Sequence, residues 1–414
     1  LMETFDDIYI LDLHGNSKKK ERSPDGSKDE NVFDIQQGVA IGIFVKKPKG
    51  SGRVNVRHAE LWGLRKDKYA HLFETDVNTM AWNELKEFDR ESCLGKFYFF
   101  APKAFDNIDE YCDGWSIKNI FPVQQNAIKT DRDNLFYDFE KSVLENRIET
   151  FYSEKGLSYP FREKYKVEDS SSYSLLSRRL NTSFDINNIH QSLYRPFDVR
   201  YLYYISGLTS RPAWEVMSHM LIGTNIGLIT TRQTSDDWDC LVTNILCGHK
   251  SCAAYDINSL FPIYLYPKDT KTSLFETDET TEAPGGRRPN LAPEFITDFS
   301  ERLQMDFITD GKGDRVKTFG PEDVFDYMYA VFHSPTYRSR YAEFLKIDFP
   351  RLPLTSNPEL FRSLCALGSE LVGLHLMEQH THPITDYSIK GDNIVEAVRY
   401  TEPGQGAEAG RVWI

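Results

Sequence analysis

Residues 8–20, IYILDLHGNSKKK, join an apolar run directly to a basic turn. Five of the first six residues are Ile, Tyr or Leu, which is typical of a buried β-strand. Gly15 and Asn16 then end the apolar run, and three lysines follow: Lys18, Lys19 and Lys20. The stretch therefore predicts a strand that delivers a basic loop to one edge of a domain.

A second apolar run follows in NVFDIQQGVAIGIFVKK, residues 31–47, and predicts a strand over about 39–45. The segment between the two strands is polar and contains a Pro-Asp-Gly turn but no helical pattern. We therefore expect the two strands to form an antiparallel pair. VNVRHAELWG, residues 54–63, alternates as a further strand does.

The composition indicates a folded chain of two or three domains. It has 414 residues, of which 40% are hydrophobic and 27% charged. No apolar run is long enough to cross a bilayer, and no signal peptide precedes the first strand. Because the chain starts at Leu1 and enters a strand almost at once, we expect it to be a piece of a longer protein.

Six cysteines are spread through the chain without a dense framework, which fits a reducing, cytoplasmic location. Cys240, Cys247, His249 and Cys252 lie close in sequence, but their spacing fits a zinc knuckle poorly. We expect buried or incidental thiols there, and no metal site.

The net charge is −13, which argues against indiscriminate binding of polyanions. The charge is unevenly distributed, however. From Arg178 to Arg232 there are six arginines and three acidic residues, a net charge of +3. From Lys268 to Ala330 there are eight basic and fourteen acidic residues, a net charge of −6. Positive charge is thus concentrated in the middle of the chain.

The stretch SLYRPFDVRYLYY, residues 192–204, places arginines among aromatic residues within this basic segment. Arginine offers a planar fork for phosphate or guanine, and aromatic rings offer stacking faces. A strand whose aromatic residues fill a core, with arginines paired to Asp198, fits the same pattern. The residues alone leave both interpretations open.

No motif for a nucleophile, a zinc protease or a phosphate-binding loop is present. Asp131, Asp133 and Asp138 lack the downstream Glu-x-Lys of a metal-dependent nuclease and predict a polar turn. We therefore assign no catalytic residue.

The last part of the chain, from about residue 291, has a helical pattern after a polar, acidic stretch over 268–290. Asn357 and Pro358 are typical of a helix start. The leucines that follow share one face of the predicted helix: Leu360, Leu364, Leu367, Leu371 and Leu374. DVFDYMYAVFH and YRSRYAEFLK predict companion helices.

Several long motifs, in this order, resemble the C-terminal part of Type ISP restriction–modification enzymes. They are FDDIYILDLHGNSKKKE, SPDG, KDENVFDIQQGVAIGIFVK, SLYRPFDVRYLYY, LITTRQ, FPIYLYP and YMYAVFHSPTYRSRYAEFLKIDFPRLPL. In that family one polypeptide carries a nuclease, a translocase, an N6-adenine methyltransferase and a target-recognition domain. The resemblance runs over nearly the whole chain.

The resemblance implies an α+β chain that begins with the last strand pair of a Rossmann-like methyltransferase sheet. The glycine-rich cofactor loop and the Asn-Pro-Pro-Tyr motif are missing from this chain. S-adenosylmethionine would therefore bind elsewhere in the full-length enzyme, and this chain would carry no cofactor. Phe33 matches the aromatic residue that stacks on a flipped-out adenine in the family, although it could equally pack the loop.

The implied organisation is a methyltransferase fragment over 1–55, a mixed α/β target-recognition domain over 56–267, a linker or exposed excursion over 268–290, and a mainly helical part over 291–414. The expected partners are double-stranded DNA and the missing methyltransferase, translocase and nuclease domains, with no membrane. The expected DNA-binding residues are Lys18, Lys19, Lys20, Arg178, Arg179, Tyr194, Arg195, Arg200, Arg211, Arg232 and Gln233. A methyltransferase that is active only with its missing half, and a helical docking scaffold, are the alternatives.

Overall fold

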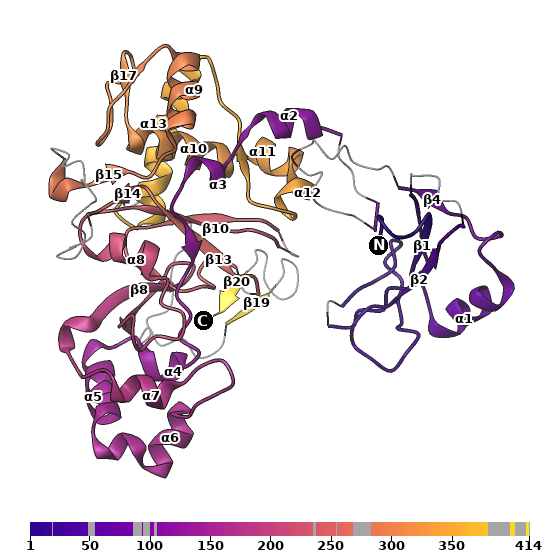
Figure 1. Ribbon diagram of the computed structural model, residues 1–414, viewed down its shortest axis with the longest axis horizontal. Helices are drawn as coiled ribbons and strands as arrows, with labels where there is room; N and C mark the ends of the chain where they lie inside the picture. Colours follow the sequence, from indigo (N-terminus) through magenta and orange to yellow (C-terminus); the bar gives the residue numbers. More distant parts are fainter. Residues whose placement is uncertain are drawn as a thin grey trace.

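A computed structural model gives a mixed α/β architecture (Figure 1). The structure describes residues 1–18, 20–48, 54–85, 93, 100–102, 106–234, 237–253, 255–267, 283–379, 398–401 and 411–413. Within these ranges there are thirteen α-helices and several small sheets. The N-terminal unit lies apart from the main body (Figure 1).

The N-terminal unit is built on a four-stranded sheet with the order β2-β1-β3-β4. Its elements are β1 (Asp7–Asp12), β2 (Ala40–Val45), β3 (Asn55–Glu60), β4 (Asn83–Glu84) and α1 (Arg65–Glu74). β1 pairs antiparallel with β2 and parallel with β3. The antiparallel pair predicted from the sequence is therefore confirmed. β2 forms one edge of this sheet and is exposed along its whole length.

A second sheet, with the order β12-β8-β9-β7, lies among short helices in the middle of the chain. The stretch SLYRPFDVRYLYY, together with the three residues before it, forms its central hairpin, with Pro196 and Phe197 at the turn. Aromatic and β-branched residues favour these strands. Adjacent residues are buried in both strands, Ser192 and Leu193 in β8 and Leu202 and Tyr203 in β9, so the hairpin is partly covered on both faces. The elements are α4 (Asp133–Phe136), β7 (Tyr137–Asp138), α5 (Lys141–Tyr152), α6 (Tyr159–Tyr165), α7 (Leu175–Leu180), β8 (Ile189–Arg195), β9 (Asp198–Tyr203) and β12 (Leu246–Cys247).

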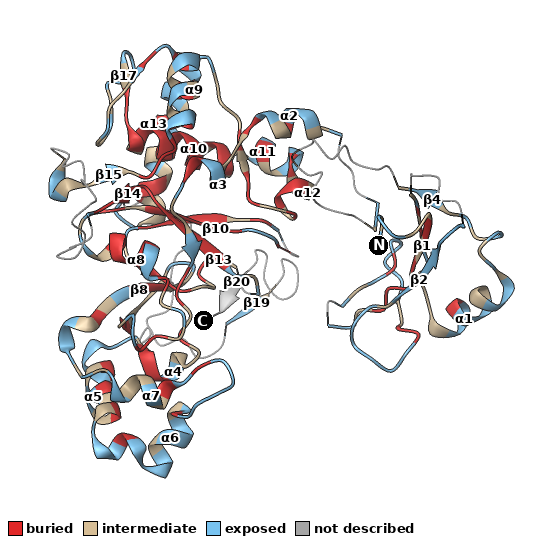
Figure 2. Ribbon diagram, in the orientation of Figure 1, coloured by how far each residue is buried: buried red, intermediate tan, exposed pale blue. Residues whose placement is uncertain are grey.

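A third sheet, with the order β11-β10-β13-β6, is almost completely buried except at its edge strand β6. Its side chains join the cores on both sides. Figure 2 colours most of β10 as buried. The elements are β6 (Gln125–Asn126), α8 (Trp214–Leu221), β10 (Gly227–Thr231), β11 (Cys240–Thr243) and β13 (Asn258–Pro262).

Helices dominate the last described part, around a core rich in phenylalanine and tyrosine. They are α9 (Pro293–Leu303), α10 (Pro321–His333), α11 (Pro335–Arg340), α12 (Ala342–Leu345) and α13 (Pro358–His375), and α2 (Ile108–Asp113) and α3 (Ile117–Ile120) pack beside them. The remaining strands form two-stranded sheets: β5 (Trp115–Ser116), β14 (Tyr264–Leu265), β15 (Arg288–Pro289), β16 (Asp306–Phe307), β17 (Thr318–Phe319), β18 (Arg351–Leu352), β19 (Arg399–Thr401) and β20 (Arg411–Trp413).

The helix predicted after Pro358 is confirmed, and the side chain of Asn357 accepts hydrogen bonds from the backbone N–H groups of Glu359 and Leu360. The leucine face, however, is not the buried one. Leu360 and Leu367 are 48% and 60% exposed. The buried face carries small and aromatic residues instead: Phe361, Cys365, Gly368, Val372 and Gly373.

Two further findings concern the organisation of the chain. Cys93 and Cys112 form a disulfide, which differs from the reduced thiols expected from the sequence. β3 pairs with β1 in the N-terminal sheet, although residues 56 onward were assigned to target recognition. The domain boundaries themselves stay predictions, and most of the expected linker, residues 268–282, lies outside the described residues.

Candidate nucleic-acid interface

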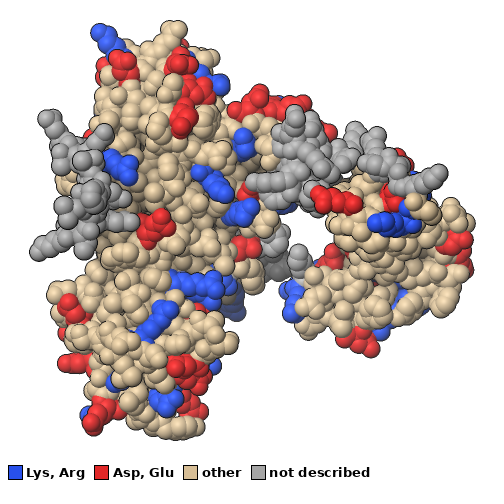
Figure 3. Space-filling model, in the orientation of Figure 1, with Lys and Arg blue, Asp and Glu red and all other residues tan. Residues whose placement is uncertain are grey.

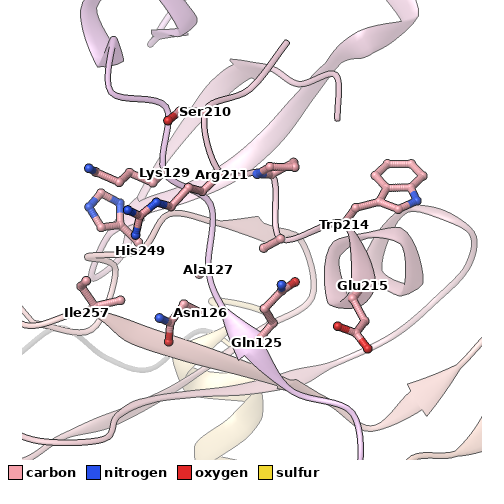
Figure 4. A pocket seen from close by; sticks show the side chains of 12 residues that line it. Gln125, Asn126, Ala127, Lys129, Ser210, Arg211, Trp214, Glu215, His249 and Ile257 are labelled. Carbon is pink, nitrogen blue, oxygen red and sulfur yellow. The ribbon is translucent and has the colours of Figure 1, made fainter. Parts of the chain in front are cut away.

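The edge strand β6 borders two neighbouring hollows in the surface of the main body. They have volumes of about 530 and 540 Å³, and both are lined by Asn126 and Ile257. We call this combined depression the β6 trough. The first hollow, drawn in Figure 4, is lined by Gln125, Asn126, Ala127, Lys129, Ser210, Arg211, Pro212, Ala213, Trp214, Glu215, His249 and Ile257. The second is lined by Lys118, Gln124, Asn126, Arg232, Gln233, Tyr255, Asp256, Ile257, Ser259 and Phe349.

Arg211 combines a fixed backbone with a side chain that has no hydrogen bond or ion pair among the described residues. Its backbone is fixed to Lys129 by two hydrogen bonds of 2.9 and 3.0 Å. Its side chain is exposed and lines the first hollow, and within the described residues nothing bonds to its guanidinium. A fixed backbone with a free guanidinium leaves five N–H donors available for an anion or a base edge.

Arg232 and Gln233 line the second hollow, just after β10 ends. The Nε atom of Arg232 donates to Asp348 Oδ1 at 2.8 Å, while its side chain remains 55% exposed. Asp348 therefore holds the inner nitrogen and leaves the terminal nitrogens of the fork for another partner. Gln233 is also exposed. Three of the predicted residues thus lie around one depression.

In contrast, the side chains of Arg178 and Arg179 form hydrogen bonds with the protein's own backbone. Arg178 donates to the carbonyl oxygens of Thr209 and Ser210. Arg179 donates to three successive carbonyl oxygens at the C-terminal end of α5, those of Phe151, Tyr152 and Ser153, at 2.7–3.0 Å. These hydrogen bonds give both arginines a structural role. Their predicted contact with DNA stays an untested prediction.

Arg195 and Arg200 both lie over the ring of Tyr194, with guanidinium carbons 4.3 and 4.0 Å from its centroid. Arg200 also forms a two-pronged ion pair with Asp198, which raises the pKa of Arg200. The pairing with Asp198 expected from the sequence is therefore confirmed for Arg200. Arg195 donates instead to backbone carbonyl oxygens. The Tyr194 hydroxyl donates to Asp133, so this ring is already engaged.

In the N-terminal unit, Lys18 and Lys20 are exposed in the loop after β1, and Lys19 lies outside the described residues. Phe33 is 57% exposed, so its ring is not packed into the loop. Its backbone is held at both ends. Its N–H donates to Asn31 Oδ1 at 2.8 Å, and its carbonyl accepts from Arg65 at 3.0 Å.

His249 contributes a neutral acceptor to the first hollow. Burial lowers its pKa, so the imidazole is uncharged at neutral pH. Its Nδ1 lies 3.1 Å from the carbonyl oxygen of Ile128, and because a carbonyl oxygen only accepts, Nδ1 carries the proton. Nε2 is then an acceptor.

The charges that line the trough are mixed. Lys129 pairs with Asp131 at 2.7 Å. Burial raises the pKa of Asp131, but hydrogen bonds from Lys129 and Ser210 outweigh burial and leave it lowered. On the face shown in Figure 3, Lys and Arg side chains lie across the middle of the main body near β8, and most Asp and Glu side chains lie toward its ends.

The sequence analysis missed Gln124, Gln125 and Asn126. They stand together in VQQNAIK, and a run of three amides on a short strand is the signal that could have identified them. Amide side chains carry both a donor and an acceptor, which is the chemistry of base-edge recognition.

No described cluster of His, Cys, Asp and Glu could hold a metal ion. Cys240, Cys247 and Cys252 are free, buried thiols, and burial raises the pKa of each. None of the helices in the described ranges is long and apolar enough to span a membrane.

Comparison with known proteins identifies the family. Residues 119–414 match the model of the Type ISP C-terminal specificity domain. The chain therefore belongs to this family, as the sequence motifs predicted. No match was found among curated proteins.

Similar folds occur in three solved structures. The chain resembles "ATP-dependent Type ISP restriction-modification enzyme LlaBIII bound to DNA" with a TM-score of 0.66, 21% identity and coverage of 93% of this chain and 24% of that one. For the DrdV–DNA complex the TM-score is 0.64 and the identity 22%, with coverage of 95% of this chain and 38% of that one. For a nuclease-deletion mutant of the Type ISP enzyme LlaGI with a DNA substrate mimic, the TM-score is 0.59 and the identity 20%, with coverage of 92% of this chain and 33% of that one. The chain thus spans about a quarter to two fifths of the length of these proteins.

Proposed function

We propose that this chain is the DNA target-recognition portion of a cytoplasmic Type ISP restriction–modification enzyme. It binds double-stranded DNA in a sequence-specific way and so directs N6-adenine methylation and cleavage by other domains of the same polypeptide. The observation that carries the proposal is the specificity-domain match over residues 119–414, which includes the whole β6 trough apart from Lys118. The solved structures with a similar fold are described as complexes with DNA or a DNA mimic.

The electrostatics of the main body support this proposal. Duplex DNA is attracted by local positive charge even when the total charge is negative. Arg211 and Arg232 supply exposed guanidinium groups at the trough, where amides and a neutral imidazole stand beside them. Phosphate binding alone needs only cations, whereas sequence reading needs such directional groups as well.

For the N-terminal unit, we propose that the sheet is the end of a longer, Rossmann-like methyltransferase sheet. All residues of β2 are exposed, including the apolar Ile41, Ile43, Phe44 and Val45 on both faces of the strand. Apolar residues on both faces are typical of a strand that other elements cover on each side. Helices of the longer polypeptide would provide that cover, and its preceding strands would extend the sheet and help to hold S-adenosylmethionine and the catalytic amide.

The test is selection from a pool of duplexes with a randomised centre. The purified 414-residue chain is mixed with the pool at about 0.1 M salt, and the bound duplexes are sequenced. We expect one motif to be enriched, and competition with single-stranded DNA to remove little of the binding. Recovery of DNA without any motif would contradict sequence-specific binding, and recovery of no DNA would favour a docking scaffold.

A further inference from the structure

The β6 trough brings together amide side chains from two separate segments. Gln124, Gln125 and Asn126 stand on and beside β6, and Gln233 follows β10. Consecutive residues of a strand point to opposite faces. Accordingly, Gln125 lines the first hollow, Gln124 lines the second, and Asn126 lies where the two meet.

Asn126 and Arg232 are oriented by neighbours before any ligand arrives. Ser259 donates to Asn126 Oδ1 at 2.9 Å, and the backbone of Asn126 is paired with β13. Asp348 holds Arg232 by its Nε. Ordered side chains lose less conformational entropy on binding, which favours specific contacts.

The trough is also unsuited to a simple phosphate track. Glu215 and Asp256 line it together with the basic residues, and His249 is neutral there. Carboxylates repel phosphates, but they accept hydrogen bonds from the amino group of cytosine. A lining that includes both donors and acceptors fits the edges of base pairs in the major groove.

We propose, on the basis of the proposed function, that the β6 trough reads bases in the major groove. Gln125, Asn126 and Gln233 contact adenine through paired donor and acceptor atoms, and Arg211 and Arg232 contact guanine through their forks. The recognised sequence therefore contains both A·T and G·C pairs at positions that these residues specify.

The experiment repeats the duplex selection with single alanine variants at Gln125, Asn126, Gln233, Arg211 and Arg232. Gln191→Ala and Arg362→Ala are matched controls, because both residues are exposed and lie outside the trough. Circular dichroism and a urea titration check that each variant folds. Affinities are then measured for the selected duplex and for its single-base-pair substitutions.

We expect each trough variant to lose discrimination at one or two base pairs, by about 5- to 150-fold, and both controls to retain the parent motif. Gln233→Glu, which keeps the size but only accepts, should move the preference at its position from adenine toward cytosine. Variants that fold and enrich the unchanged motif would overturn the inference, and so would an equal loss of affinity for every sequence. If the parent chain itself enriches no motif, the proposed function fails first and the inference fails with it.

Discussion

Arg179 and Arg211 show how one residue type serves two purposes within the same basic segment. Arg179 satisfies three carbonyl oxygens where α5 ends, while the guanidinium of Arg211 has no bonding partner within the described residues. A guanidinium that donates hydrogen bonds to backbone carbonyl oxygens contributes to the free energy of unfolding. Removal of a guanidinium without such bonds changes this free energy little. All these arginines carry the same charge, so it is their hydrogen-bond partners that distinguish structural arginines from candidates for DNA contact.

Arg179→Ala should lower the free energy of unfolding by about 1–3 kcal/mol, because it leaves helix-terminal carbonyl oxygens without their donor. Arg211→Ala should change it by less than about 0.5 kcal/mol. Urea titrations of both variants, with Arg362→Ala as the control, measure the difference. Equal stabilities for Arg179→Ala and Arg211→Ala would contradict this division.

Phe33 offers a second test at the residue scale. Its exposed ring contributes little packing, so Phe33→Ala should change the free energy of unfolding by less than about 0.5 kcal/mol. If the ring stacks on an extruded adenine in the longer polypeptide, the variant should lose about 1–3 kcal/mol of stacking and should slow methylation more than it weakens DNA binding. Phe73→Ala is the control, since Phe73 is 89% exposed. Unchanged methylation kinetics would exclude the stacking role.

At the scale of elements, the contact between α10 and α13 depends on a glycine. A Cβ added at Gly368 would lie 1.8 Å from the backbone oxygen of Asp326, so the two helices approach too closely for any side chain there. Gly368→Ala should destabilise the protein by about 1–3 kcal/mol or more, although alanine gains about 1 kcal/mol of helix propensity. Gly373→Ala is the control because its Cβ meets only the flexible side chain of Gln379. A thermal or urea titration in which both variants match the parent would refute the close contact.

The same helix pair holds a histidine that makes stability depend on pH. Burial, followed by Arg338 and His375, lowers the pKa of His333 from 6.5 to about 4. The unfolded chain therefore binds a proton more readily, so stability is present above pH 6.5 and is lost as the pH falls toward 4. The loss is about 3 kcal/mol at most, at 1.36 kcal/mol for each pKa unit. His333→Asn should lose less stability than the parent in urea titrations over this range, and equal losses would show that His333 does not contribute.

Local patterns predicted the elements well but not their environment. The strand pair at the N-terminus and the helix after Asn357 follow from apolar periodicity and capping residues, whereas the hairpin turn at Pro196 and Phe197 was not predicted. The shared face of the leucines does not identify the closest contact of that helix, because the crossing with α10 selects a small residue, Gly368, that permits close approach. Likewise, β6 has only two residues, too few for a periodic signal, and its place beside Arg211 and Arg232 arises from pairing with distant β13.

For the whole molecule, the distribution of charge decides how an acidic chain can bind DNA. Lys118 is exposed in the second hollow and has no ion pair among the described residues, whereas Lys317 is exposed in the acidic segment that precedes α10. The segment with a net charge of −6 repels phosphates and should face away from the duplex. Binding should then occur on the trough side only.

Neutralising Lys118 should therefore weaken binding to cognate and scrambled duplexes alike, because a lysine at the rim contacts phosphate and carries no sequence information. Lys118→Gln should reduce the slope of log K against log[salt] by about one unit, the value expected for one lost phosphate contact. Lys317→Gln should leave both the affinity and the slope unchanged. The measurement is a fluorescence anisotropy titration of labelled duplexes at four salt concentrations. If Lys317→Gln reduces the slope and Lys118→Gln does not, the duplex lies against the acidic side, and the orientation proposed for the molecule is wrong.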